Sequence, residues 1–195
     1  MIRTALLIIS FLQSFWHVIH AQNGHILAIS QEFDGLVVFT ECEPLSEYDI
    51  LDEITVTSIP PTQVSKPPIN YMDVRDLYIR TTKKMNDDAD GIIIKLSKSG
   101  VSSAVIIKFL NESISNDTSI VKTSRGLYCF VDSQPINSYK NLGPIVNKLN
   151  LYNVPYKIAR EGFLKRCIKQ FPKSEGVIFE FKYNTPNTAD AVRLF

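Results

Sequence analysis

Histidine, tryptophan, cysteine and glycine are all scarce in this chain. Its 195 residues include 3 His, 1 Trp, 3 Cys and 8 Gly. Three cysteines are too few for a disulfide-dense scaffold, and no Cys-x-x-Cys pair occurs, so dithiol exchange lacks its second thiol. A net charge of +1 gives no global case for nucleic-acid binding, and 45% hydrophobic content excludes wholesale disorder.

Long hydrophobic runs are absent beyond the first 21 residues. Residues 1–21 carry Arg3, then an apolar core of roughly 15 residues, and end at the small residue Ala21, which is the layout of a secretory signal peptide. A spanning helix needs about 20 apolar residues, so an uncleaved anchor is the less favoured alternative and no stable membrane insertion is expected after cleavage. We therefore expect a protein that is secreted or resides in the lumen of the endoplasmic reticulum.

Cleavage at that point leaves almost no histidine. His17 and His20 are removed with the signal, and His25 stays close to the new terminus. The commonest general base and metal ligand is then missing from the body of the chain, and no glycine-rich phosphate loop is present. The sequence predicts neither an enzyme nor a cofactor.

Two glycosylation sequons fit this destination. Asn111 and Asn116 begin Asn-Glu-Ser and Asn-Asp-Thr in a polar segment between apolar runs. Such a segment keeps a glycan in solvent, so both are candidate glycosylation sites.

The chain contains an internal repeat. Residues 35–51 (GLVVFTECEPLSEYDIL) resemble residues 126–142 (GLYCFVDSQPINSYKNL), with Glu/Asp and Leu/Ile exchanges. A second block follows in the same order, because residues 75–84 resemble 160–169 and residues 90–96 resemble 175–181. Two blocks in one order favour a duplication.

Each repeat has a similar pattern of expected elements. Apolar runs predict buried strands over residues 36–40 and 127–132, and again over 91–96 and 176–183, with hairpin partners over 102–110 and 191–195. In the second repeat, apolar spacing with Pro144 in the first turn predicts a helix over residues 141–152. A strand over residues 154–158 and an amphipathic helix over 163–171 are expected to follow.

That succession resembles the thioredoxin fold of the protein disulfide isomerase family. The closest detail is the strand and turn before Lys140-Asn141-Leu142-Gly143-Pro144, which is similar to the start of the helix that follows the family's redox pair. The resemblance implies an α/β fold of two tandem thioredoxin-like domains, each a small mixed sheet flanked by helices. The expected boundaries are residues 22–110 and 124–195, with 111–123 as a glycosylatable linker.

The redox positions implied by this resemblance carry no cysteine. Leu45 to Tyr48 and Ile136 to Tyr139 stand there instead. The resemblance therefore implies redox-inactive domains that bind polypeptides. We expect apolar and aromatic surface near Tyr48 and Tyr139 to make the contact, although both tyrosines are equally consistent with core positions.

The three cysteines allow one bridge and one remaining thiol. Cys129 on a predicted strand and Cys167 on the core face of a helix are consistent with a disulfide or with two buried thiols. Cys42 follows a strand end. It is interpreted either as a partly shielded surface thiol or as a free thiol that forms a mixed disulfide with another chain.

Charge is divided unevenly between the two halves. Residues 22–99 hold 13 acidic and 7 basic side chains, whereas residues 100–195 hold 7 and 13. Opposed halves favour docking or homo-association, and two solvated faces are the alternative. The stretch from Asn86 to Gly91 mimics the start of a calcium loop, but Ser97 occupies the position where a bidentate Glu is required, so no metal site is predicted.

Together these patterns predict a redox-inactive secretory-pathway protein that binds polypeptides noncovalently, as a chaperone-like or scaffolding module. The alternative is a secreted effector or surface-interaction protein with an extracellular partner.

Overall fold

The structure is a computed structural model, and it describes residues 25–55, 71–96, 102–111, 116–146, 155–181 and 188–195. The predicted signal peptide, residues 147–152 of the segment expected as a helix over residues 141–152, and Ser113 of the first sequon lie outside these ranges.

The described elements occur twice in the same order. The first half, residues 27–109, comprises β1 (Leu27–Ser30), β2 (Glu32–Phe33), β3 (Leu36–Thr40), β4 (Cys42–Pro44), β5 (Tyr48–Thr55), α2 (Tyr71–Met85), β6 (Gly91–Leu96) and β7 (Ser102–Phe109). The second half, residues 118–194, comprises β8 (Thr118–Val121), β9 (Thr123–Ser124), β10 (Leu127–Val131), β11 (Ser133–Pro135), β12 (Tyr139–Pro144), α3 (Tyr156–Gln170), β13 (Gly176–Glu180) and β14 (Thr188–Leu194). Residues at the same place in the two halves are called matched positions below.

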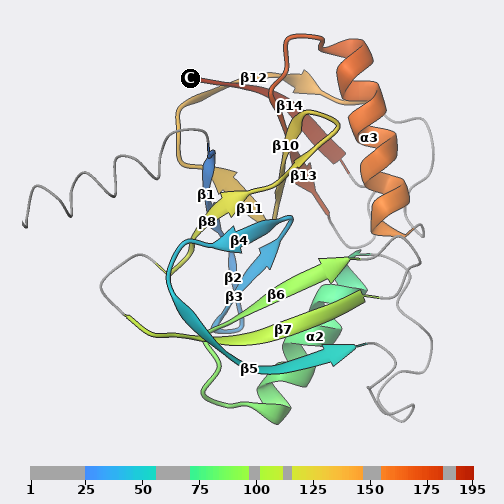
Figure 1. Ribbon diagram of the computed structural model, residues 1–195. Coiled ribbons are helices and arrows are strands. Elements are labelled where there is room, and N and C mark those ends of the chain that lie inside the picture. The colour runs from blue at the N-terminus through green and yellow to red at the C-terminus, as the bar shows by residue number, and fades with distance from the viewer. Residues whose placement is uncertain (1–24, 56–70, 97–101, 112–115, 147–154, 182–187) are drawn as a thin grey trace, which may run out of the picture.

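The two halves join through one ten-stranded sheet. Its main path runs β12-β14-β13-β10-β3-β6-β7-β5. Counted inward from either edge, the strands of one half follow the same order as the matched strands of the other. β3 and β10 meet antiparallel at the centre, where Thr40 lies opposite Val131. On its other side, β3 pairs in parallel with β6, and β10 pairs in parallel with β13. Apart from β1, which lies beside β8 and β11, most of the first half lies in the lower part of Figure 1 and most of the second half in the upper part.

A second sheet ties the halves together by exchanging strands. Its order is β11-β1-β8-β4, so β1 of the first half pairs with β11 of the second, and β8 pairs with β4. Residues 118–121, inside the segment expected as a linker, are therefore the strand β8. The exchange means that neither half completes its strand pairing alone.

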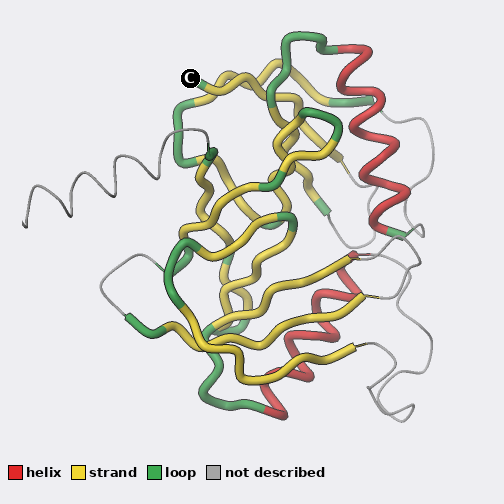
Figure 2. The backbone as a smooth tube through the Cα atoms, in the orientation of Figure 1, coloured by secondary structure: helices red, strands yellow, loops and turns green. Residues whose placement is uncertain are grey.

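The central strands of the large sheet, β3, β6, β10 and β13, are buried on both faces, which explains why they are almost continuously apolar. Leu36 and Val38 of β3 pack with α2, whereas Phe39 packs with Cys42 of the small sheet. Matched side chains of β10 divide in the same way between α3 and the small sheet. Alternate side chains of a strand face opposite sides, so a strand covered on both sides must be apolar throughout. Figure 2 shows the two helices, in red, beside the strands.

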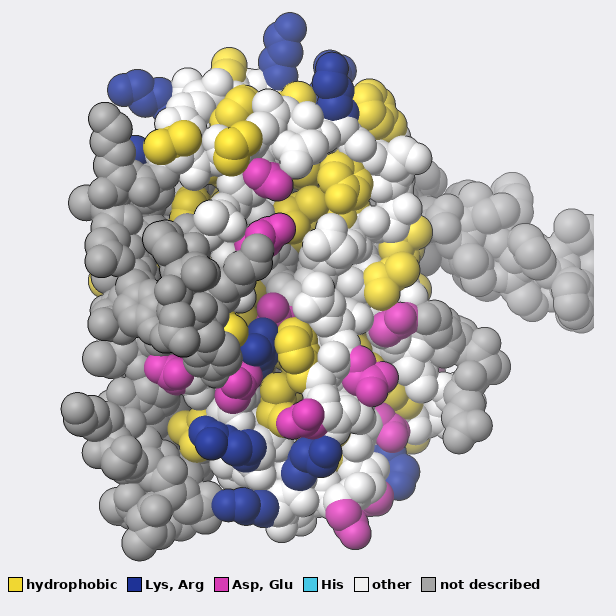
Figure 3. All heavy atoms as spheres, turned by 180° about the vertical axis from the view of Figure 1, so that it is seen from behind, with side chains coloured by type: hydrophobic (Ala, Val, Ile, Leu, Met, Phe, Trp, Pro, Cys, Tyr) yellow, Lys and Arg dark blue, Asp and Glu magenta, His cyan; other side chains and the backbone are white. Residues whose placement is uncertain are grey.

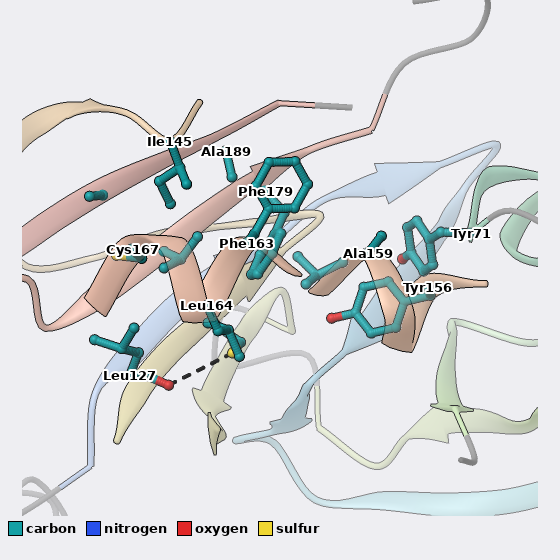
Figure 4. Close-up of a cluster of buried hydrophobic side chains, with 14 of the residues drawn as sticks. Tyr71, Leu127, Ile145, Tyr156, Ala159, Phe163, Leu164, Cys167, Phe179 and Ala189 are labelled. Atoms are coloured by element: carbon teal, nitrogen blue, oxygen red, sulfur yellow. Dashed lines mark hydrogen bonds between the residues drawn. The ribbon is translucent and has the colours of Figure 1, made fainter. Parts of the chain in front are cut away.

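The core beneath α3 extends across the junction between the halves. Phe163, Leu164 and Cys167 of α3 pack against Phe179 of β13, as Figure 4 shows. Tyr71 at the start of α2 belongs to the same cluster, and its ring centroid lies 5.4 Å from that of Tyr156.

Tight turns recur at matched positions. Asp34 and Gly35 have φ of 52° and 81°, and Arg125 and Gly126 have φ of 54° and 78°. Two successive positive φ angles define the two-residue hairpin turn that follows the twist of its strands, and glycine adopts the second at little cost.

The predicted fold class is wrong. The described chain is mainly β, with a four-stranded antiparallel sheet, a ten-stranded mixed sheet and two helices, and these are not tandem thioredoxin α/β domains. The helix expected from residue 141 is replaced up to Pro144 by the edge strand β12. The matched segment of the first half is also a strand, β5. The strand expected over residues 154–158 is wrong too, because α3 begins at Tyr156.

Candidate functional site

The side chains at the predicted degenerate redox positions begin the two edge strands. Tyr48 is the first residue of β5 and Tyr139 the first of β12, while Leu45 and Ile136 precede them by three residues. Leu45 is 39% exposed, Ile136 47% and Tyr139 40%, and Tyr48 is half-buried. These residues are therefore neither redox positions of a helix start nor full members of the core.

Hydrogen bonds hold the second-half segment in place. The N–H of Ile136 donates to the carbonyl of Leu27 at 3.1 Å, and the N–H of Phe195 donates to the carbonyl of Ser138 at 3.0 Å. Phe195 is 70% exposed and lies beside the start of β12. We call Ile136, Tyr139 and Phe195 the second-half corner.

The first half has a matching arrangement. The N–H of Leu45 donates to the carbonyl of Thr118 at 2.9 Å, and the N–H of Leu110 donates to the carbonyl of Glu47 at 3.0 Å. Leu110, at the position matched to Phe195, is 53% exposed. Leu45, Tyr48 and Leu110 form the first-half corner.

The two corners retain apolar character while their neighbours change. Leu45 matches Ile136, Tyr48 matches Tyr139 and Leu110 matches Phe195. Between these positions, Ser46-Glu47 becomes Asn137-Ser138, and Asp49 becomes Lys140. Apolar side chains therefore recur at these matched positions although all but Tyr48 are exposed, and Tyr48 packs against the cluster that contains Phe39 and Cys42.

A buried polar cluster lies where the halves meet, and sequence reasoning missed it. The Arg75 guanidinium donates to Asp132 at 3.2 Å, and the Arg160 guanidinium donates to Glu41 at 2.6 Å. Each pair joins one half to the other, and all four side chains are 8–15% exposed. Both acids adopt positive φ, 58° for Glu41 and 46° for Asp132. The internal repeat already pointed to these pairs in the sequence, since Arg75 matches Arg160. Glu41 and Asp132 are likewise one of the Glu/Asp exchanges between the two copies.

Two matched tyrosines, Tyr71 and Tyr156, lie beside this cluster, but only the hydroxyl of Tyr71 is hydrogen-bonded among the described residues. The Tyr71 hydroxyl donates to Asp132 Oδ2 at 2.6 Å and lies 2.7 Å from Thr40 Oγ1. Burial raises the pKa of Tyr71 well above its usual value, and the Asp132 carboxylate raises it further. The hydroxyl of Tyr156 has no hydrogen-bond partner within the described residues; Val131 stands where Thr40 stands in the first half, and Glu41 bonds Arg160 but not this hydroxyl. The cluster fastens the two halves to each other.

The three cysteines are free and buried. Cys129 and Cys167 lie in the same core cluster, where Cys129 Sγ donates to the Leu127 carbonyl at 3.7 Å and Cys167 Sγ lies 3.1 Å from Ser174 Oγ. Cys42 is 2% exposed in the small sheet, so it is no surface thiol. Burial raises the pKa of all three thiols, that of Cys129 to about 12.

Among the described residues no group of His, Cys, Asp and Glu is arranged to hold a metal ion. The acids of the calcium-like stretch have other partners, since Asp88 pairs with Lys108 at 2.8 Å and Asp90 accepts a bond from the N–H of Phe109. Of the two sequon residues, Asn111 is exposed and Asn116 is half-buried ahead of β8.

Comparisons with protein-family models, with curated proteins and with solved structures found no match to this chain. Neither described helix has the length and apolarity needed to cross a bilayer.

Proposed function

We propose that this protein binds polypeptides noncovalently at its two corners, as a chaperone-like or scaffolding module of the secretory pathway. The observation that carries the proposal is the recurrence of apolar side chains at three matched positions of the two halves, where five of the six side chains are at least 39% exposed and Tyr48 is half-buried.

Each corner offers both kinds of contact that an extended polypeptide needs. Burying one large apolar side chain under a partner contributes about 1.5–3 kcal/mol, so a corner of three supplies anchors of useful strength. The corner also opens onto an edge strand that has no second strand neighbour among the described residues. Edge strands pair with extended peptides through backbone hydrogen bonds, which bind without demanding one sequence.

The thiols support the redox-inactive part of the proposal. Thiol–disulfide exchange needs an accessible thiolate, whereas burial and the raised pKa of Cys42, Cys129 and Cys167 keep these groups protonated and out of contact with a client. Secretory-pathway placement rests on the signal-like residues 1–21 and the two sequons.

The test is a binding titration against an unfolded probe. Fluorescein-labelled α-lactalbumin, reduced and carboxymethylated, is titrated with the purified protein and followed by fluorescence anisotropy. The variant Leu45→Ser, Leu110→Ser, Ile136→Ser, Tyr139→Ser, Phe195→Ser should weaken binding by about tenfold or more, because it removes the exposed anchors of both corners.

The matched control is the double variant Ile158→Ser, Ile168→Ser on α3. These isoleucines are 60% and 45% exposed and lie outside both corners. The control should bind as the unmodified protein does. Equal binding by both variants, or equal loss in both, would contradict the proposal.

A further inference from the structure

The ten-stranded sheet ends in two strands that each have one described neighbour. β5 pairs with β7 and β12 pairs with β14, and the described residues supply no strand beyond either. The two edges lie at opposite ends of the molecule, below and above in Figure 1. Each leaves backbone N–H and carbonyl groups available to another strand.

The two edges carry opposite charge. β5 contains Asp49, Asp52 and Glu53 and no basic residue, whereas β12 contains Lys140 and no acidic residue. Asp49 and Lys140 are matched positions, so the charge is reversed at the same place in the two halves.

The basic edge is not neutralised by its own neighbours. Lys140 lies directly opposite Arg193 across the β12–β14 pair, and such like-charge pairs destabilise a sheet. The matched pair in the first half is Asp49 opposite Lys108, which are of opposite sign. Among the described residues neither Lys140 nor Arg193 makes an ion pair. In Figure 3, Lys and Arg side chains project from the upper end of the molecule, whereas the middle and lower part carries Asp and Glu together with further Lys and Arg.

We propose that copies of this chain associate head to tail, with the acidic β5 edge of one copy beside the basic β12 edge of the next. The charges also exclude the alternatives. Two β5 edges repel each other, and so do two β12 edges, because each carries Lys140 with Arg193 of β14 directly beside it, so symmetric dimers through like edges are disfavoured. Because the contact joins unlike surfaces, it extends into open chains of molecules.

The ends of β12 limit the contact. Pro144 lacks an N–H, and the pairing shifts register between Asn141 and Gly143, so the regular part of the edge covers residues 139–141. A short edge with complementary charge predicts weak, reversible association. By strand alternation Lys140 faces the side opposite to Tyr139, so this association does not rest on polypeptide binding at the corners.

Sedimentation velocity of the purified protein tests the proposal. At about 0.05 M NaCl the mean sedimentation coefficient should rise with protein concentration, and at about 0.5 M NaCl the rise should be lost, because salt screens exposed charges. A constant coefficient at low salt would overturn the proposal.

Charge reversal identifies the edges. Lys140→Glu and Asp49→Lys each leave one functional edge, so each variant alone should remain monomeric at low salt. An equal mixture of the two should associate again at low salt, since each edge of one variant meets an edge of opposite charge at the matched position of the other. Lys165→Glu on the exposed face of α3 should associate as the unmodified protein does. A mixture that stays monomeric, or a Lys165 variant as defective as Lys140→Glu, would refute the assignment.

Discussion

Arg75 of the first half donates to Asp132 of the second half at 3.2 Å, across the junction where β3 and β10 meet. The matched pair, Arg160 and Glu41, spans the same junction in the opposite direction at 2.6 Å. Together with the exchanged strands β1 and β8, these pairs make the two repeats one interlocked body that presents two similar corners.

Arg75→Ala should lower the free energy of unfolding by about 3 kcal/mol, because it leaves the Asp132 carboxylate buried without its cation. Arg125→Ala is the control. Its partner Glu161 is 33% exposed, so the loss should stay below about 1 kcal/mol. Urea unfolding measures both. Equal losses would contradict a special role for the pairs at the junction.

The two buried tyrosines should respond differently to removal of their hydroxyl groups. Tyr71→Phe removes a donor to Asp132 and a partner of Thr40 and should cost about 1–3 kcal/mol. Tyr156→Phe removes a buried hydroxyl without a described partner and should be neutral or stabilising. Thermal unfolding of the two variants distinguishes them, and a larger loss for Tyr156→Phe would be incompatible with this structure.

The raised pKa of the thiols predicts instability at high pH. Unfolded cysteine ionises near pH 8.5, whereas the pKa of folded Cys129 is about 12. Between these values the folded state binds more protons, so stability falls as pH rises, by about 1.4 kcal/mol per pH unit for this group. Chemical denaturation at stepped pH should show this slope reduced in Cys129→Ala. An unchanged slope in that variant would contradict burial of the thiol.

Exposure of Asn111 predicts a glycan there when the full chain is made in eukaryotic secretory cells. Asn111→Gln should lose one glycan, measured as a mass shift on peptide-N-glycosidase digestion. Mass spectrometry of the same product should find Gln22 as its first residue. An unmodified Asn111 or a retained residue 1 would argue against passage along this route.

Several elements could be predicted from the sequence because their pattern is local. The apolar runs at residues 36–40 and 91–96 are strands because helices and the small sheet cover both faces. The hairpin partners β7 and β14 followed from the same reasoning. The turn at Asp34-Gly35 could also have been found, since Asp-Gly between apolar runs is a strong hairpin signal.

The edge strands could not be predicted in the same way. β12 mixes exposed polar residues with Leu142, Gly143 and Pro144, and this spacing with an early proline also suits the start of a helix. The exchange of β1 and β8 between the two halves is even harder to predict from local sequence patterns. Leu27–Ser30 pairs with residues more than a hundred positions away, and no periodicity encodes that choice. Leu45, Tyr48, Ile136 and Tyr139 were selected through a resemblance to a fold that the chain does not have, yet they fall at matched positions in the two corners, one corner in each half.

The most direct test of the account places a photo-crosslinking residue, p-benzoylphenylalanine, at Tyr139 in the second-half corner or at Ile158 on α3. Each protein is irradiated with reduced, carboxymethylated α-lactalbumin, and adducts are quantified on denaturing gels. Crosslinking from position 139 that is competed by unlabelled probe, with little from position 158, is the predicted result. Equal crosslinking from both positions, or none from position 139, would contradict polypeptide binding at the corners.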